Sequence, residues 1–244
     1  MDAINLFIES KDGVHFIKFS EGKYIKTPKG NDLSSTNLKL IDSIIYDLQK
    51  YEDVEIEENQ SISGEPLEKI SLYTLLSTQL DFYDKDRKLC YPDLEFSTDP
   101  LLNICPGPEK IDQLQQWRVI IQILKRRGFD FQKVQSYSND LTLRERLREQ
   151  ICVDFNSSSN FLKSVFINIA TIYGTYLGSW CFCFNGLSED EFATALKYTG
   201  DFQWQVDYEL TLEKEKLDEK EMLELFRDEK RNTYLTNSVI KKCF

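Results

Sequence analysis

The sequence predicts an α+β protein, with a small antiparallel β-rich domain at the amino terminus followed by an α-helical domain. Residues 6–33 alternate in hydrophobicity and contain the turn signals Asp12-Gly13 and Glu21-Gly22, which are typical of short paired strands. From residue 111 onward, apolar residues recur every three or four positions instead, which is the period of helices that bury one face. The change of period along the chain favours two segregated parts over an alternating α/β fold.

A group of prolines separates the two parts. Pro100, Pro106 and Pro108 lie close together in the sequence. Because a helix interior tolerates proline poorly, no helix is expected to run through all three. We therefore predict a β-rich domain over residues 1–99 and a helical domain over residues 100–244.

Individual elements follow from local patterns. Apolar residues at helical spacing from Leu38 to Leu48, behind the hydroxyl residues 34–36, predict an amphipathic helix. A stripe from Ile111 to Leu124 that ends before Gly128 predicts a second helix, and the spacing of Leu143, Leu147 and Ile151 predicts a third. Residues 47–68 are rich in acids and are expected to form an exposed connection.

The glycine- and lysine-rich stretch from Phe19 to Leu33 suggests a phosphate-binding loop at first sight. Such a loop requires the pattern G-x-x-x-x-G-K-[ST] between a strand and a helix. Here Gly22 and Gly30 are eight positions apart, and Asn31 follows Gly30. The sequence instead predicts a turn at Thr27-Pro28-Lys29-Gly30, with its lysines projecting into water.

Residues 164–186 contain no charged side chain and are numerous enough to cross a bilayer. Gly174 and Gly178 also have the spacing of a G-x-x-x-G helix contact. One interpretation is a membrane-anchored interaction or structural protein. The other, which we favour because Asn168, Asn185 and several hydroxyls lower the hydrophobicity, is a central helix buried in a bundle, without stable membrane insertion.

Charge and composition restrict the chemistry. Acidic residues outnumber basic ones by 41 to 30, and the net charge of −11 disfavours binding to nucleic acid or to an anionic lipid surface. The single histidine, His15, falls in a predicted strand, and Cys181-Phe182-Cys183 has no second cysteine pair to complete a metal site. We expect free thiols, no cofactor, no metal and no enzyme activity, with an enzyme that uses an unrecognised acidic site as an alternative.

Several short motifs occur in the same order as in the ATP12-type assembly chaperones of mitochondrial ATP synthase, a family that this chain resembles from about residue 12 to residue 235. The motifs are Gly22 to Leu33 before a helix, Pro66-Leu67 with Ile70, Leu89-Cys90-Tyr91, Gln113 with Trp117, Leu187-Ser188 with Glu191, and Asp201-Phe202-Gln203. The chain departs from the family pattern at Glu68, where the family has threonine, and at Gln205, where the family has glycine after tryptophan.

The resemblance implies a chaperone that hydrolyses no nucleotide, binds the unassembled α subunit in the mitochondrial matrix and shields its β-facing surface until β displaces it. It implies a monomer when free, with Glu191, Asp201 and Gln203 at the partner surface. A transit peptide is not visible, because Asp2 follows the first methionine and no arginine precedes Arg87. For Glu191 a second interpretation stays open, since Ser188 and Glu191 also form an S-x-x-E capping box.

Overall fold

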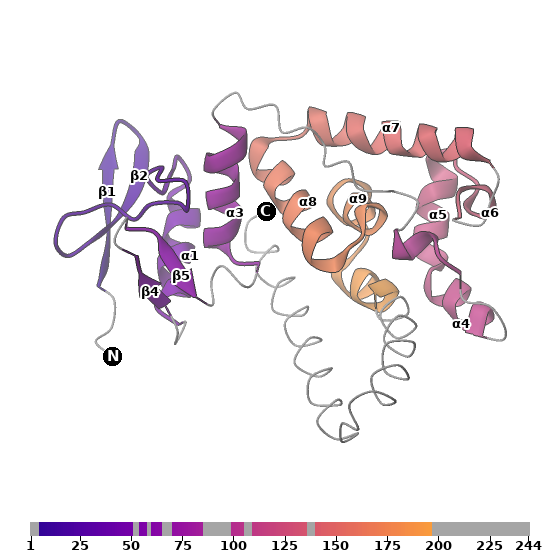
Figure 1. Ribbon diagram of the computed structural model, residues 1–244, viewed down its shortest axis with the longest axis horizontal. Coiled ribbons are helices and arrows are strands. Elements are labelled where there is room, and N and C mark those ends of the chain that lie inside the picture. Colours follow the sequence, from indigo (N-terminus) through magenta and orange to yellow (C-terminus); the bar gives the residue numbers. More distant parts are fainter. Residues whose placement is uncertain are drawn as a thin grey trace, which may run out of the picture. The chain divides into compact units, whose positions relative to one another are not determined.

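The computed structural model describes residues 5–50, 54–57, 60–64, 70–84, 99–104, 109–135 and 140–196. These residues group into two compact units (Figure 1). The first unit includes the described residues up to 84 together with 159–165, and the second includes 99–158 and 166–196. The boundary that the prolines predict between residues 99 and 100 stays a prediction.

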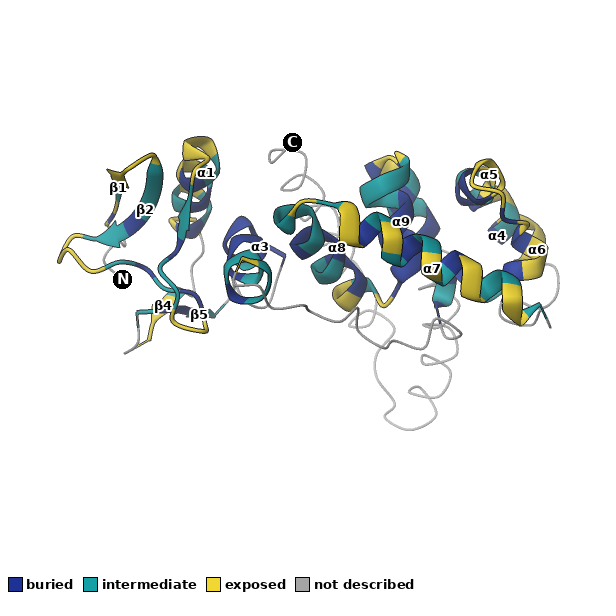
Figure 2. Cartoon of the chain, turned by 90° about the horizontal axis from the view of Figure 1, so that it is seen from above, coloured by how far each residue is buried: buried dark blue, intermediate teal, exposed yellow. Residues whose placement is uncertain are grey.

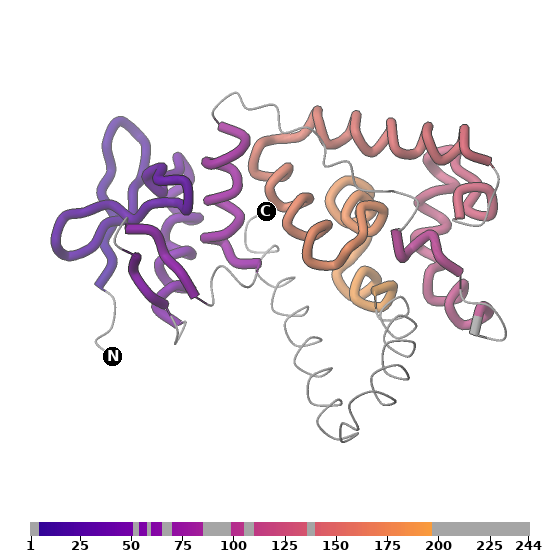
Figure 3. The backbone as a smooth tube through the Cα atoms, viewed as in Figure 1, coloured from indigo at the N-terminus to yellow at the C-terminus, as the bar shows by residue number. Residues whose placement is uncertain are grey.

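A three-stranded antiparallel sheet forms one layer of the first unit. Its order is β1 (Leu6–Lys11), β2 (Val14–Phe19) and β3 (Ser34–Ser35). The chain reverses between β1 and β2 at Asp12 and Gly13, whose φ angles of 51° and 77° are both positive, as in a type I′ hairpin turn (Figure 3). The hairpin predicted from Asp12-Gly13 is therefore confirmed.

Helix α1 (Leu38–Leu48) covers this sheet and confirms the helix predicted there. The N-cap of α1 is Asn37, whose side chain accepts a hydrogen bond from the Leu40 amide. The sequence placed the cap among residues 34–36, but Ser34 and Ser35 pair with β2 instead. The buried face of α1 packs with the inner face of the sheet, and helix α3 (Leu72–Thr78) packs beside it. The core residues are Leu6, Ile17, Ile25, Leu33, Ile41, Ile44, Leu48, Ile62, Leu72, Tyr73 and Leu76.

A second hairpin lies in the acidic region expected to be only an exposed connection. Strands β4 (Val54–Ile56) and β5 (Ile62–Gly64) pair antiparallel, and the Ile62 side chain is buried in the core. The Tyr73 hydroxyl accepts a hydrogen bond from the Ile62 amide at 3.2 Å and donates one to the Lys26 carbonyl at 3.1 Å. The prediction was wrong here because one buried isoleucine anchors an otherwise polar stretch.

The predicted turn at Thr27 to Gly30 is confirmed, and a distant carboxylate holds it. The Gly30 amide donates to the Thr27 carbonyl at 2.8 Å, and Gly30 has a φ of 80°. The buried side chain of Asp81, in the π-helical turn η1 (Gln79–Tyr83) after α3, accepts hydrogen bonds from the Thr27 hydroxyl, from the Asn31 amide group at 2.7 Å and from the Lys29 backbone amide at 3.2 Å. We call these contacts the Asp81 clamp.

The sequence led us to expect that the lysines of this stretch project into water. Two of them contact other side chains instead. Lys26 forms an ion pair with Asp32 at 2.7 Å. The Lys29 ammonium lies 3.4 Å from the centre of the Phe82 ring, within the range of a cation–π contact. Both contacts stay within the first unit and add to the Asp81 clamp.

The second unit is helical. Its elements are the 3₁₀ turn η3 (Pro100–Leu102), α4 (Glu109–Gln116), α5 (Arg118–Arg126), α6 (Phe131–Val134), α7 (Leu141–Ser157), most of α8 (Asn160–Tyr173), and α9 (Tyr176–Asn185). The helix expected from Ile111 to Leu124 is thus divided at Trp117, whose ring is fully buried and whose Nε1 donates to the Ala195 carbonyl at 3.1 Å. Gly128 ends α5 with a φ of 83°, as predicted.

The uncharged segment 164–186 forms parts of two helices instead of one. Gly174, with a φ of 64°, separates α8 from α9, so the single central helix and the G-x-x-x-G contact were wrong. Gly178 in α9 does permit a close approach, because a Cβ there would lie 2.9 Å from side-chain atoms of Leu101, Phe192 and Thr175. Figure 2 shows α9 largely buried. Across the described ranges, no helix combines the length and hydrophobicity needed to span a membrane.

The amino terminus of α9 is held by Asp99, a fully buried carboxylate. Its Oδ1 accepts from the Leu101 amide at 3.0 Å and from the Thr175 hydroxyl at 2.9 Å, and its Oδ2 accepts from the Leu177 amide at 2.9 Å. Burial raises the pKa of Asp99 to about 6, although these hydrogen bonds act in the opposite direction. This side chain therefore joins η3 to the first turn of α9.

Candidate partner-binding site

Glu191 lies in the first turn of a helix that begins at residue 189, directly after Leu187 and Ser188. Its Oε2 accepts hydrogen bonds from the Ser188 amide at 2.9 Å and from the Ser188 hydroxyl at 2.7 Å. The Glu191 amide in turn donates to the Ser188 hydroxyl at 3.4 Å. The capping box that the sequence predicts is therefore present.

These contacts explain the electrostatics of the carboxylate. The two hydrogen bonds from Ser188 lower the pKa of Glu191, and the positive charge of Arg118 lowers it further by a smaller amount. Only Oε2 takes part in the cap; within the described part of the chain, Oε1 has no hydrogen-bond partner. Among the described residues, capping therefore occupies one oxygen of Glu191 and leaves the other without a hydrogen bond.

Glu191 borders a surface hollow of about 300 Å³ in the second unit. One wall comes from the end of α4 and the start of α5, and the other from the helix that begins at residue 189. The hollow is lined by Gln115, Gln116, Arg118, Val119, Asp190, Glu191 and Thr194. Its rim thus combines two carboxylates, one guanidinium group and two side-chain amides.

Sequence reasoning identified Glu191 in this hollow but missed Arg118. Arg118 is exposed, and among the described residues it makes no ion pair. A usable signal was present, since Ile111, Gln115 and Arg118 follow one another at four and three positions and so fall on one helix face. Ile111 itself was counted in the apolar stripe that predicted the helix, but its side chain is 72% exposed, so its place in the buried face was predicted wrongly.

The other two predicted contact residues, Asp201 and Gln203, lie outside the described residues, and their place at a partner surface stays a prediction. The same holds for the motif residues Pro66-Leu67 and Leu89-Cys90-Tyr91. Gln113 and Trp117 are described and are both buried; the Gln113 side-chain amide donates to the Asn103 carbonyl at 3.2 Å. These two residues stabilise the helical unit from inside.

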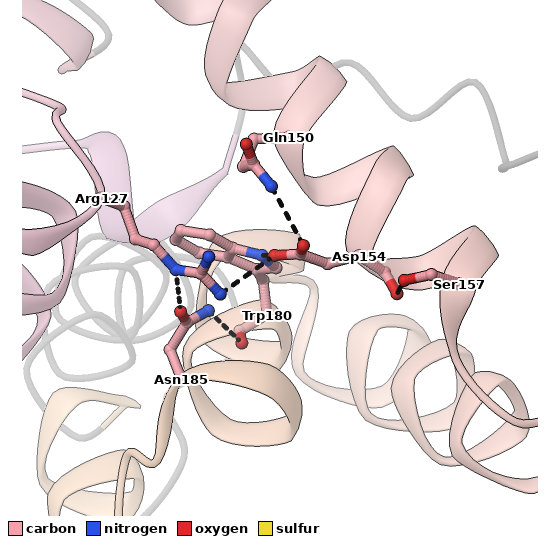
Figure 4. Close-up of polar contacts among 6 residues, drawn as sticks. All are labelled: Arg127, Gln150, Asp154, Ser157, Trp180 and Asn185. Atoms are coloured by element: carbon pink, nitrogen blue, oxygen red, sulfur yellow. Dashed lines mark hydrogen bonds and ion pairs between the residues drawn. The ribbon is translucent and has the colours of Figure 1, made fainter.

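A second carboxylate, Asp154 in α7, forms a polar network that Figure 4 shows in detail. Its Oδ2 accepts from Trp180 Nε1 at 2.8 Å and pairs with Arg127 at 3.3 Å, and its Oδ1 accepts from the Gln150 side chain at 3.0 Å. Arg127 also donates to Asn185 Oδ1 at 2.5 Å. Both oxygens of Asp154 thus bind groups of the protein itself, and the network joins α5, α7 and α9.

The described cysteines are free thiols. Cys181 is buried and Cys183 is half-buried, and burial raises the pKa of both thiols, which makes them poor nucleophiles. His15 lies in β2, where its Nδ1 is 2.7 Å from the Ser10 hydroxyl. No group of histidine, cysteine or acidic side chains in the ranges given above has the geometry to hold a metal ion.

Comparison with known proteins gives one finding about the fold. Neither a protein-family model nor a curated protein matches this sequence. Among solved structures, a point mutant of P. denitrificans Atp12p matches with a TM-score of 0.51 and 14% sequence identity, over 95% of this chain and 95% of that chain. The match confirms the predicted α+β class, and the chain has the Atp12p fold.

Proposed function

We propose that this protein is an assembly chaperone for the catalytic head of mitochondrial ATP synthase that binds the unassembled α subunit in the mitochondrial matrix. The observation that carries the proposal is the match to Atp12p along nearly the whole of both chains. The motif residues Gln113, Trp117 and Glu191 support it, because the first two hold the helical unit together and the third lies at the rim of a surface hollow.

The physical need for such a protein follows from the partner. An α subunit without its β neighbours exposes a large interface, and exposed apolar surface leads to aggregation. A chaperone that covers this surface keeps the subunit competent for assembly. When β arrives, a larger or better-packed interface displaces the chaperone through its higher affinity, so that release requires no nucleotide.

Co-purification with the α subunit of the same organism tests the proposal. We expect a stoichiometric complex with free α subunit, no complex with the completed catalytic head, and release of the chaperone when β subunit is added. The β subunit alone serves as the control partner. Failure to recover α subunit with the chain would refute the proposal, and size-exclusion chromatography of the free chain tests the expected monomer.

A further inference from the structure

We infer that the hollow beside Glu191 binds a basic side chain of the partner, with Arg118 contacting an acceptor next to it and Ile111 supplying an apolar contact at the edge. The inference rests on the proposed function and extends it, because it specifies the chemistry of the partner segment. The lining charges, the free oxygen of Glu191 and the exposure of Ile111 carry it.

The charges of the hollow select the sign of the ligand. Asp190 and Glu191 contribute two negative charges to the lining and Arg118 contributes one positive charge. An anionic ligand such as a phosphate would meet two carboxylates, whereas a lysine or arginine side chain would be attracted to them. Arg118 then remains to bind a carbonyl or carboxylate oxygen of the same partner segment.

Glu191 is held in place for this contact before a partner arrives. The two hydrogen bonds from Ser188 to Oε2 fix the side chain in one position, while Oε1 has no hydrogen bond to the described residues. A glutamate that is already ordered loses less conformational entropy on binding than a mobile one. The cap therefore prepares the carboxylate for its partner.

The surface next to the hollow continues along α4. Ile111 is 72% exposed, the highest value among the exposed large hydrophobic residues that the structure describes. Hydrogen bonds from the Trp117 amide to Gln113 and from the Ile121 amide to Trp117 keep the helical path across the division between α4 and α5, so Ile111, Gln115 and Arg118 share one face. A partner segment that fills the hollow can therefore also cover Ile111.

The occupant is a protein segment and not a small molecule. Small-molecule sites are mostly apolar and enclosed, whereas Val119 is the one apolar side chain among the seven described residues that line this hollow. An ordered, mixed-charge rim with an exposed isoleucine beside it is instead the composition of a protein interface, where polar groups surround a hydrophobic contact. The unassembled α subunit is the partner that the proposed function supplies.

Competition during co-expression tests the inference without purified α subunit. A tagged α subunit is co-expressed with the untagged wild-type chain and one variant. The ratio of the two recovered chains is measured by mass spectrometry of the proteolytic peptides that contain the substituted position, in which even the small mass change from glutamate to glutamine is resolved. The variants are Glu191→Gln, Arg118→Gln and Ile111→Ser. The controls make the same kinds of change at exposed positions of α7, namely Glu145→Gln, Arg146→Gln and Leu141→Ser.

We expect each variant of the hollow to be recovered about five- to tenfold less than the wild-type chain, and each control to be recovered within about twofold of it. Because glutamine still accepts the hydrogen bond from Ser188, Glu191→Gln should keep the thermal stability of the wild-type chain. If each of the six variants is recovered with the α subunit in the same amount as the wild-type chain, the inference is wrong and the proposed function stands. If no wild-type chain is recovered, both are refuted.

Discussion

Replacing Asp81 by alanine should loosen the turn between Thr27 and Gly30. Asp81 is 3% exposed and accepts three hydrogen bonds from that turn and the residue after it, although 50 or more residues separate them in sequence. The variant removes the acceptor and leaves the three donors in place.

The magnitude follows from how easily water can replace the lost acceptor. The Thr27 side chain is fully buried, so its hydroxyl should incur the full cost of an unsatisfied group, about 1–3 kcal/mol. Lys29 is exposed and Asn31 is half-buried, so water can reach their donors and each loss should cost only about 0.5 kcal/mol. Together these contributions predict a loss of about 2–4 kcal/mol in the local free energy of opening.

Native-state hydrogen exchange measures this loss where it occurs. The Ile25 amide donates to the Ile17 carbonyl and the Leu33 amide donates to the Ile25 carbonyl, both at 2.8 Å, on either side of the turn. A loss of about 2–4 kcal/mol should accelerate exchange at both amides by roughly 30- to 1,000-fold. Tryptophan fluorescence is a poor substitute, because Trp117 and Trp180 lie in the second unit.

Two control variants sharpen this experiment. Asp81→Asn keeps an oxygen for Thr27 and Asn31 but turns an amide group toward the Lys29 amide, so its cost should be about 1 kcal/mol. Asp84→Ala removes an exposed carboxylate from the end of the same segment and should cost less than about 1 kcal/mol. If Asp81→Ala accelerates exchange no more than Asp84→Ala does, the clamp does not hold the turn.

Three further predictions concern the second unit. The folded-state pKa of Asp99 is raised from 3.8 to about 6, so its contribution to the free energy of unfolding is largest below pH 4. This contribution should fall by about 3 kcal/mol as the pH rises from about 4 to above 6. Chemical unfolding followed by tryptophan fluorescence should show this decrease in the wild-type chain and not in Asp99→Asn. Gly178→Ala should lower stability by about 1–2 kcal/mol in the same assay, since its Cβ would be 2.9 Å from three side chains; a gain in stability would show that the site has room. Glu191→Ala should lower the melting temperature more than Glu191→Gln, because only glutamine can still accept from Ser188; equal losses would mean that the capping box contributes nothing.

The elements that could be predicted from the sequence are those that neighbouring residues determine. Asp12-Gly13 adopts the two positive φ angles that a two-residue hairpin requires, and the spacing from Leu38 to Leu48 places one apolar face of a helix on the sheet. Gly128 ends α5 for an equally local reason, since its amide donates to the carbonyl of Lys125 in the last turn at 3.0 Å. In each case the signal and its structural effect lie within one helix or one hairpin.

The errors have the opposite origin, since they depend on contacts between residues far apart in the sequence. An acidic composition indicated exposure for residues 47–68, but Tyr73 and the core hold Ile62 and with it a hairpin. The absence of charge from residue 164 to residue 186 indicated one long helix, but Asp99 and Thr175 begin a new helix after Gly174. A buried carboxylate that caps a distant helix leaves no periodic pattern in the sequence.

The candidate site depends both on a local sequence signal and on a contact between residues far apart in the sequence. Ser188 and Glu191 are three positions apart, so their capping box could be predicted, whereas the approach of Arg118 to the same hollow depends on the packing of α4 and α5 against the following helix. The sequence presented capping and partner contact as competing roles for Glu191. The geometry makes them compatible, because Oε2 serves the cap and Oε1 has no hydrogen bond to the described residues.

This division of the carboxylate changes which variants can separate the two roles. A substitution that removes both oxygens, such as Glu191→Ala, alters the helix start and the hollow together, and a weaker complex would then have two explanations. Glu191→Gln retains an acceptor for Ser188 and removes the negative charge, so a weaker complex at unchanged stability can arise only from the hollow. Ser188→Ala makes the reverse change, because it leaves the charge of Glu191 and removes the hydrogen bond from the Ser188 hydroxyl, while the one from the amide at 2.9 Å remains. It should therefore lower stability and loosen the position of Glu191, which should weaken binding by a smaller amount. An affinity that falls for Glu191→Gln and stays unchanged for Ser188→Ala would show that the charge matters and that its prior ordering does not.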